Sequence, residues 1–215
     1  MKKYIPFVIF AIVIFGIVFF AYKKTPVMTP KPDLNHYVNN EYGFEIYYPK
    51  NITLTSNFGT FYHLPALWRS GALTDENGNS NGKPIISIPA FYTESDNSYP
   101  RYFSAQLRIG ASAAPKDVAT CLENDQGYAE EPKSDETING VNFKKFEFAD
   151  AAMMQYLKVI SYRTIHNGMC FALEQLKTGS NYRDDPTSTK NISDAQLNAY
   201  FDSIGEIVKT FRFIK

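Results

Sequence analysis

Histidine and cysteine are scarce in this sequence of 215 residues, which contains three histidines and two cysteines. No histidine lies in an H-E-x-x-H or H-x-x-x-H pattern, so a zinc hydrolase has almost no support. A G-x-S-x-G turn, an S-x-x-K motif and a phosphate-binding loop are absent as well. These absences leave no catalytic, cofactor-binding or metal-binding residue to nominate, and no cofactor is expected.

An excess of basic charge is also missing, because 22 basic residues balance 22 acidic ones. That balance argues against a nucleic-acid binder, which depends on lysine and arginine to displace counterions from phosphates. Four lysines lie within residues 1–24, so residues 25–215 carry 18 basic and 22 acidic side chains, a formal charge of −4. The sequence therefore indicates a basic, apolar N-terminus followed by a mildly acidic globular domain.

What the N-terminus does contain is an apolar run, Ile5 to Tyr22, of 18 residues without a charge. As a helix it would span roughly 27 Å, enough for the hydrocarbon core of a bilayer. Lysine pairs flank it at positions 2–3 and 23–24. The run predicts a single transmembrane helix that contacts the lipid bilayer through residues 5–22.

A cleaved signal peptide is the main alternative for this run. No A-x-A-like cleavage site ends it, which favours an uncleaved signal anchor over residues 1–24. The lysine pairs tie on the positive-inside count, but the short N-terminus and long C-terminal part favour a cytoplasmic N-terminus. Residues 25–35 follow as a proline-rich linker, and residues 36–215 as an extracytoplasmic domain of a single-pass cell-membrane protein.

The two cysteines, Cys121 and Cys170, lie far from the apolar run and belong to no C-x-x-C pair. They either form a disulfide or are two unrelated buried thiols. An extracytoplasmic domain favours the disulfide, since oxidising compartments allow such bonds to persist.

The domain shows short alternating or apolar runs typical of strands. They cover residues 42–49, 52–54, 58–64, 85–88, 102–109, 141–148, 155–166 and 169–175. Asn139-Gly140 and Asn167-Gly168 predict tight hairpin turns.

Two segments have helical patterns, residues 115–124 and a C-terminal stretch after Ser193. Ser193 and Gln196 form a capping box, and an apolar stripe runs along Leu197, Phe201, Ile204, Val208 and Phe211. The fold class is therefore α+β: an antiparallel sheet of roughly seven strands packed by a middle helix and a C-terminal amphipathic helix.

Two stretches resemble the PsbP-like (Mog1/PsbP) family, and in particular its uncharacterised membrane-anchored bacterial members. They are the opening NEYGFEIYYPK from Asn40 and the closing FDSIGEIVKTFRF from Phe201. The resemblance implies an α/β/α sandwich over residues 36–215. It implies no binding residue, and the tryptophan that often follows the first proline in that family is missing here, where Asn51 stands.

Three groups of residues are candidates for a binding site. The loop at Asp75, Asn77 and Asn79 has the spacing of a calcium loop, but Ser80 and Ile86 stand where that loop needs glycine and glutamate, so a solvated connection is favoured. An acidic cluster is expected to be a solvated face; it comprises Glu123, Asp125, Glu130, Glu131, Asp135 and Glu136. Aromatic side chains could line a surface for a glycan or a protein; they are Tyr47, Tyr48, Tyr92, Tyr99, Tyr102 and Trp68.

These observations predict a membrane-anchored extracytoplasmic binding or assembly domain that is not catalytic, with an envelope protein or glycan as partner. The alternative is a membrane-tethered hydrolase whose Ser, His and Asp meet only in three dimensions. The histidines concerned would be His36, His63 and His166.

Overall fold

The computed structural model describes residues 33–61, 64–94, 102–124, 131–153, 155–180 and 192–214, and Leu34–Lys215 form one compact unit. The apolar run over residues 5–22 and most of the linker lie outside the described residues. Within the described part of the chain, no helix is both long and apolar enough to cross a membrane.

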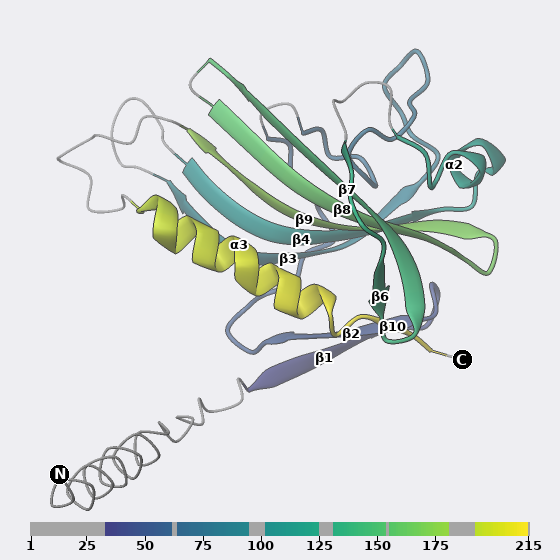
Figure 1. The fold of residues 1–215 in the computed structure, drawn as a ribbon, viewed down its shortest axis with the longest axis horizontal. Coiled ribbons are helices and arrows are strands. Elements are labelled where there is room, and N and C mark those ends of the chain that lie inside the picture. Colours follow the sequence, from purple (N-terminus) through teal and green to yellow (C-terminus); the bar gives the residue numbers. More distant parts are fainter. Residues whose placement is uncertain are drawn as a thin grey trace, which may run out of the picture. The chain divides into compact units, whose positions relative to one another are not determined.

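The unit begins with a hairpin that belongs to a small sheet of three strands. β1 (Leu34–Asn39) pairs antiparallel with β2 (Phe44–Pro49), and β2 pairs on its other side with β10 (Arg212–Phe213), near the C-terminus. Gly43 turns the chain between β1 and β2 with a φ of 66°, a conformation that costs glycine little. The two ends of the compact unit are therefore joined in one sheet (Figure 1).

The main sheet has seven strands, in the order β3-β4-β9-β8-β7-β5 with β6 also paired to β7, and these strand pairs are all antiparallel. The predicted antiparallel sheet is thus confirmed. Most strands run longer than their sequence patterns suggested. They are β3 (Lys83–Glu94), β4 (Tyr102–Ser112), β5 (Glu131–Pro132), β6 (Glu136–Ile138), β7 (Val141–Ala152), β8 (Gln155–His166) and β9 (Met169–Ser180).

Both predicted Asn-Gly turns are present. Asn139 and Gly140 have φ values of 46° and 83°, and Asn167 and Gly168 have 48° and 75°. Two successive residues with positive φ are what a type I′ turn requires, and its twist matches that of the strands it joins. These turns connect β6 to β7 and β8 to β9.

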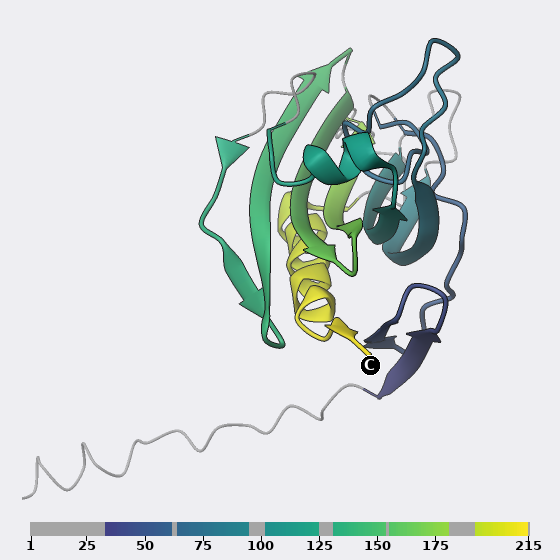
Figure 2. The same ribbon diagram turned by 90° about the vertical axis from the view of Figure 1, so that its right-hand side faces the viewer.

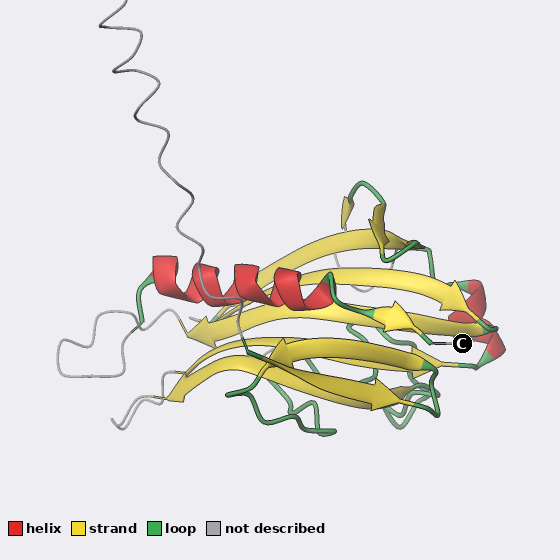
Figure 3. Ribbon diagram, turned by 90° about the horizontal axis from the view of Figure 1, so that it is seen from below, coloured by secondary structure: helices red, strands yellow, loops and turns green. Residues whose placement is uncertain are grey.

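The C-terminal helix, α3 (Asp194–Val208), is also as predicted and lies along one face of the main sheet (Figure 3). The side chain of Ser193 accepts a hydrogen bond from the backbone of Gln196, whose side chain in turn accepts one from the Ser193 backbone. Leu197, Phe201, Ile204 and Val208 are buried. The helix ends at Val208, so Phe211 joins the core from the turn that follows.

The middle of the chain corrects two predictions. The expected helix over residues 115–124 is reduced to α2 (Pro115–Ala119), which lies at one end of the main sheet instead of packing across a face (Figure 1). The amides of Thr120 and Cys121 bond back to the carbonyls of Lys116 and Val118, which closes the helix there. Cys121 consequently follows the helix in a turn, where it meets Cys170.

The strands predicted at residues 52–54 and 58–64 do not form either. Residues 50–82, the cover segment, contain only the isolated bridges Thr55–Ser87, Phe61–Leu64 and Thr74–Ser80 among their described residues. Gly59 has a φ of 59°, which interrupts extended backbone within the second run. Ile52 and Leu54, at the start of this segment, pack against the core that includes α3. From Phe58 onward the segment lies on the face of the main sheet opposite α3 (Figure 2 and Figure 3).

Candidate functional site

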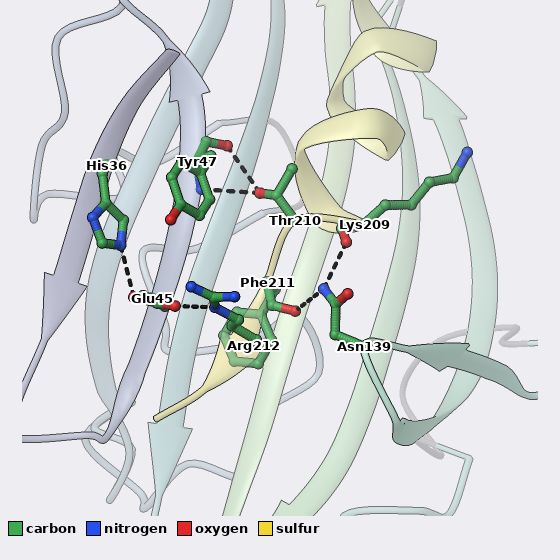
Figure 4. A network of polar contacts seen from close by, with 8 residues as sticks. All are labelled: His36, Glu45, Tyr47, Asn139, Lys209, Thr210, Phe211 and Arg212. Atoms are coloured by element: carbon green, nitrogen blue, oxygen red, sulfur yellow. Dashed lines mark hydrogen bonds and ion pairs between the residues drawn. The ribbon is translucent and has the colours of Figure 1, made fainter. Parts of the chain in front are cut away.

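A network of polar contacts joins the N-terminal hairpin to the end of the chain (Figure 4). The Glu45 carboxylate on β2 lies 2.7 Å from Nε2 of His36 on β1 and pairs with Nε of Arg212 on β10. The Glu45 side chain is 9% exposed, whereas those of His36 and Arg212 are 40% and 53% exposed. Burial raises the pKa of Glu45, but hydrogen bonds from Arg212 and His36 outweigh it and hold that pKa below its usual value. The network therefore holds a carboxylate ionised between two partly exposed basic groups.

Tyr47 extends this network on the same hairpin. Its ring is stacked on the His36 imidazole, with centroids 4.4 Å apart and an interplanar angle of 6°. Its backbone amide donates to Oγ1 of Thr210 at 2.9 Å, and the same hydroxyl lies 3.0 Å from the Tyr47 carbonyl oxygen. The Thr210 hydroxyl thereby contacts β2 on the β10 side of the small sheet, two positions before β10 begins.

The chain after α3 is held from a second side by the main sheet. The Asn139 amide in the β6–β7 turn donates to the carbonyls of Lys209 and Phe211, at 2.9 and 2.8 Å. The ring of His166, at the end of β8, is stacked on Phe213 with centroids 3.7 Å apart. Two of the three histidines therefore lie where the C-terminal strand docks.

A second polar cluster is buried between the main sheet and the cover segment, and the sequence did not reveal it. Arg108 on β4 and Glu174 on β9 are opposite each other in the sheet, and each is 1% exposed. The Glu174 carboxylate accepts hydrogen bonds from the backbone and side chain of Ser70, at 2.9 and 2.8 Å. Charged side chains inside alternating strands were the available signal, but such alternation also fits a sheet with one solvated face.

Arg108 holds the cover segment through hydrogen bonds to the backbone carbonyls of that segment. Its guanidinium donates to the carbonyls of Phe58, Gly59 and Pro65, at 3.0 Å for Gly59 and 3.4 Å for Pro65. Burial lowers the pKa of Arg108 to about 10, while the Glu174 charge acts in the opposite direction. The group is therefore charged at neutral pH, and its contacts are those of a structural clamp.

Cys121 and Cys170 lie at disulfide distance, with Cα atoms 5.7 Å apart at a sequence separation of 49. The predicted proximity of the two cysteines is confirmed. Both are fully buried beside Trp68, Ala72 and Ala172. The bond links the turn after α2 to β9 at the edge of the buried charged cluster.

In the described part of the chain, the aromatic side chains expected to form a binding surface do not lie together. Trp68 and Tyr48 are buried, and the Trp68 ring lies over Gly82, where an added Cβ would collide with it. Tyr92 is exposed on β3, and Tyr47 stacks on His36. Tyr99 lies outside the described residues, and so does the side chain of Tyr102.

In the loop with calcium-like spacing, the Asp75 carboxylate is hydrogen-bonded to groups of the loop itself. Asp75 accepts hydrogen bonds from the backbone amides of Asn77 and Asn79, at 2.9 and 2.8 Å. The backbone and side chain of Asn79 hold the pKa of Asp75 below its usual value. These contacts are those of a capped surface turn.

The acidic cluster also consists of surface contacts where it is described. Glu131 pairs with Lys133, and Glu136 with Lys145; Asp125 and Glu130 lie outside the described residues. No group of three His, Cys, Asp or Glu side chains with metal-binding geometry occurs within the described ranges.

Comparison with known proteins adds a distant likeness. No family model and no curated protein matches the chain. The chain is similar to the solution structure of cyanobacterial PsbP (CyanoP) from Synechocystis sp. PCC 6803. The two are 10% identical, with a TM-score of 0.41 over 89% of this chain and 98% of that one. No functional residue is carried over from so distant a likeness.

Proposed function

We propose that this protein is a membrane-tethered extracytoplasmic domain of the PsbP-like type, with a binding or assembly role and no catalytic one. The tether is the charge-free run of 18 residues from Ile5 to Tyr22, bounded by lysine pairs. A run of this length and composition is typical of a single membrane-spanning helix. The proline-rich linker then separates the tether from the compact unit.

The observation that carries the extracytoplasmic placement is the cysteine pair. Cys121 and Cys170 are the only cysteines of the chain, and their Cα atoms lie 5.7 Å apart at a sequence separation of 49. Two unrelated thiols have no reason to meet in this way. A cytoplasm would keep the pair reduced, whereas an oxidising compartment would let it stabilise the fold.

The contacts of the described histidines favour binding over hydrolysis. His36 is hydrogen-bonded to Glu45, and His166 is stacked on Phe213. The partner chemistry that suits this domain is an envelope protein or a glycan. A membrane-tethered hydrolase remains the alternative, and it would need a serine within hydrogen-bond reach of a histidine, such as His63, which lies outside the described residues.

Membrane extraction and thiol labelling test the tether and the topology together. The full-length chain is expected in the membrane fraction after carbonate washing, and a chain that begins at Asp33 is expected in the wash. Because both cysteines are fully buried, protein taken from its native compartment is alkylated in denaturant, and Cys121 and Cys170 should be modified only after a reductant is added. Recovery of protein cleaved after Ala21 would contradict the anchor, and ready alkylation without reductant would contradict the exported topology.

A further inference from the structure

The outer edge of β1 exposes backbone groups that can pair with another strand. Tyr47 directs its N–H and C=O toward Thr210, on the side of β2 away from β1. His36 lies opposite Tyr47, so this is a non-hydrogen-bonded pair of the β1–β2 ladder. His36 therefore directs its own N–H and C=O outward, and by strand periodicity so do Leu34 and Val38. In the described part of the chain, no strand pairs with this edge of β1.

β1 also lacks the features that normally protect a free edge. Its six residues include no lysine, arginine, aspartate, glutamate or proline, and Val38 is 42% exposed. Native edge strands usually carry charges, prolines or bulges that discourage further pairing. An uncharged edge of this length is a surface suited to an added strand.

The other edges in the described chain carry such protection. β3 contains Pro84 and Pro89, and its register with β4 shifts beside each of them. β5 is two residues long and ends in Pro132, and β10 is only two residues long. β6 is three residues long and begins with Glu136, and the part of β7 beyond β5 includes Asp150. The contrast sets β1 apart as the one unprotected edge of useful length within the described ranges.

We infer that β1 pairs antiparallel with β1 of a second copy of this chain. A strand can pair with its own copy about a two-fold axis, which closes the assembly at a dimer. β1 contains no lysine, arginine, aspartate or glutamate, and the His36 ring of each copy is hydrogen-bonded to the Glu45 carboxylate of its own chain, which limits repulsion across the axis. With the axis beside His36, Leu34 of each copy faces Val38 of the other, so all the outward N–H and C=O groups are paired. The two small sheets then merge into one, in the order β10-β2-β1-β1-β2-β10. This pairing involves β1 and β2 alone, so it does not depend on whether residues 5–22 cross a membrane.

Cross-linking of the full-length chain tests this pairing. In the proposed register the two copies of residue 36 have Cα atoms about 5.5 Å apart. His36→Cys is therefore expected to give a covalent dimer with a short bismaleimide. The wild-type chain shows how much cross-linking occurs through Cys121 and Cys170 alone. Met153→Cys, at the most exposed large apolar side chain (87%), measures random collision.

A second substitution separates backbone pairing from side-chain contact. Added to His36→Cys, Val38→Pro removes an outward N–H and should lower the cross-linked fraction about tenfold, because each copy loses an inter-strand hydrogen bond. Val38→Ala removes most of the same side chain but keeps the N–H, so the dimer should persist. Dimer no more abundant than with Met153→Cys would overturn the inference. So would equal losses for Val38→Ala and Val38→Pro, or cross-links to a different protein only.

Discussion

The two faces of the main sheet are buried in different ways. On one face, Leu107 and Ile109 of β4 pack in an apolar core with α3. On the other face, Arg108 lies between them in sequence and is equally buried, but its contacts are the carbonyls of the cover segment and the charge of Glu174. One strand thus contributes to an apolar interface and to a charged one.

The difference shows how each covering element is held. An amphipathic helix presents a regular stripe and buries it without needing partners for its backbone, which is already hydrogen-bonded. The cover segment has few backbone pairings, so its carbonyls and amides need partners from the sheet below. Arg108 and Glu174 supply these partners. Buried charges are therefore needed where irregular chain covers the sheet, beside the apolar clusters around Leu64 and Trp68.

Removing the contacts of Arg108 should have the largest effect on the free energy of unfolding. Arg108→Met removes a positive charge near the buried Glu174 and deprives three carbonyls of the cover segment of a donor. Removing one charged group from a buried cluster of this kind costs about 3–5 kcal/mol of unfolding free energy. Urea unfolding of the full-length chain measures this loss, and hydrogen exchange should show the cover segment deprotected more than α3.

Arg212→Met is the matched control for that substitution. It removes the same charged group from a position where the side chain is 53% exposed, and Glu45 keeps its contact with His36. Solvent screens a partly exposed ion pair, so the loss should be smaller than for Arg108→Met. Equal losses at the two positions would show that burial of Arg108 does not decide its effect.

Opening the disulfide should weaken the charged face by a similar amount. On the chain-entropy model, releasing a loop of 49 residues costs about 4 kcal/mol. Unfolding of the full-length chain with and without reductant measures this, and Cys121→Ala together with Cys170→Ala should reproduce the reduced value. A reductant effect that persists in this double variant would mean that the bond is not its cause.

The apolar face should respond differently to a change of one residue along the same strand. Leu107→Ala removes a fully buried side chain and should cost about 3 kcal/mol. Because α3, β4 and β9 share this core, hydrogen exchange should rise throughout the compact unit. Selective deprotection of the cover segment by this variant would contradict the division between the two faces.

The apolar face was predictable from sequence and the charged face was not. Leu197, Phe201, Ile204 and Val208 recur with helical spacing, and the Asn-Gly pairs specify their turns locally. The alternation of β4 places Arg108 opposite Leu107 and Ile109, but it does not say whether solvent or chain covers the polar side. The cover segment has no periodicity of its own, so its packing depends on contacts such as Ser70 to Glu174, 104 residues apart. The proximity of Cys121 and Cys170 was predicted from the oxidising compartment expected for the domain. The helix expected to carry Cys121, however, ends two residues before it.

The smallest expected effect concerns the start of α3, the element that covers the apolar face. The Ser193 hydroxyl accepts from the Gln196 amide at 3.2 Å, and the Gln196 side chain accepts from the Ser193 amide at 3.0 Å. Ser193→Ala removes the first of these bonds and leaves an amide of the first helical turn without its side-chain partner. Loss of an N-cap of this kind costs about 1 kcal/mol, to be measured by urea unfolding of the full-length chain. Ser203→Ala is the control, because Ser203 is exposed within the same helix and donates only to the Tyr200 carbonyl, so its change should stay within about 0.5 kcal/mol. If the two variants are equally stable, the capping box contributes nothing, and α3 is held on the sheet by its apolar stripe alone.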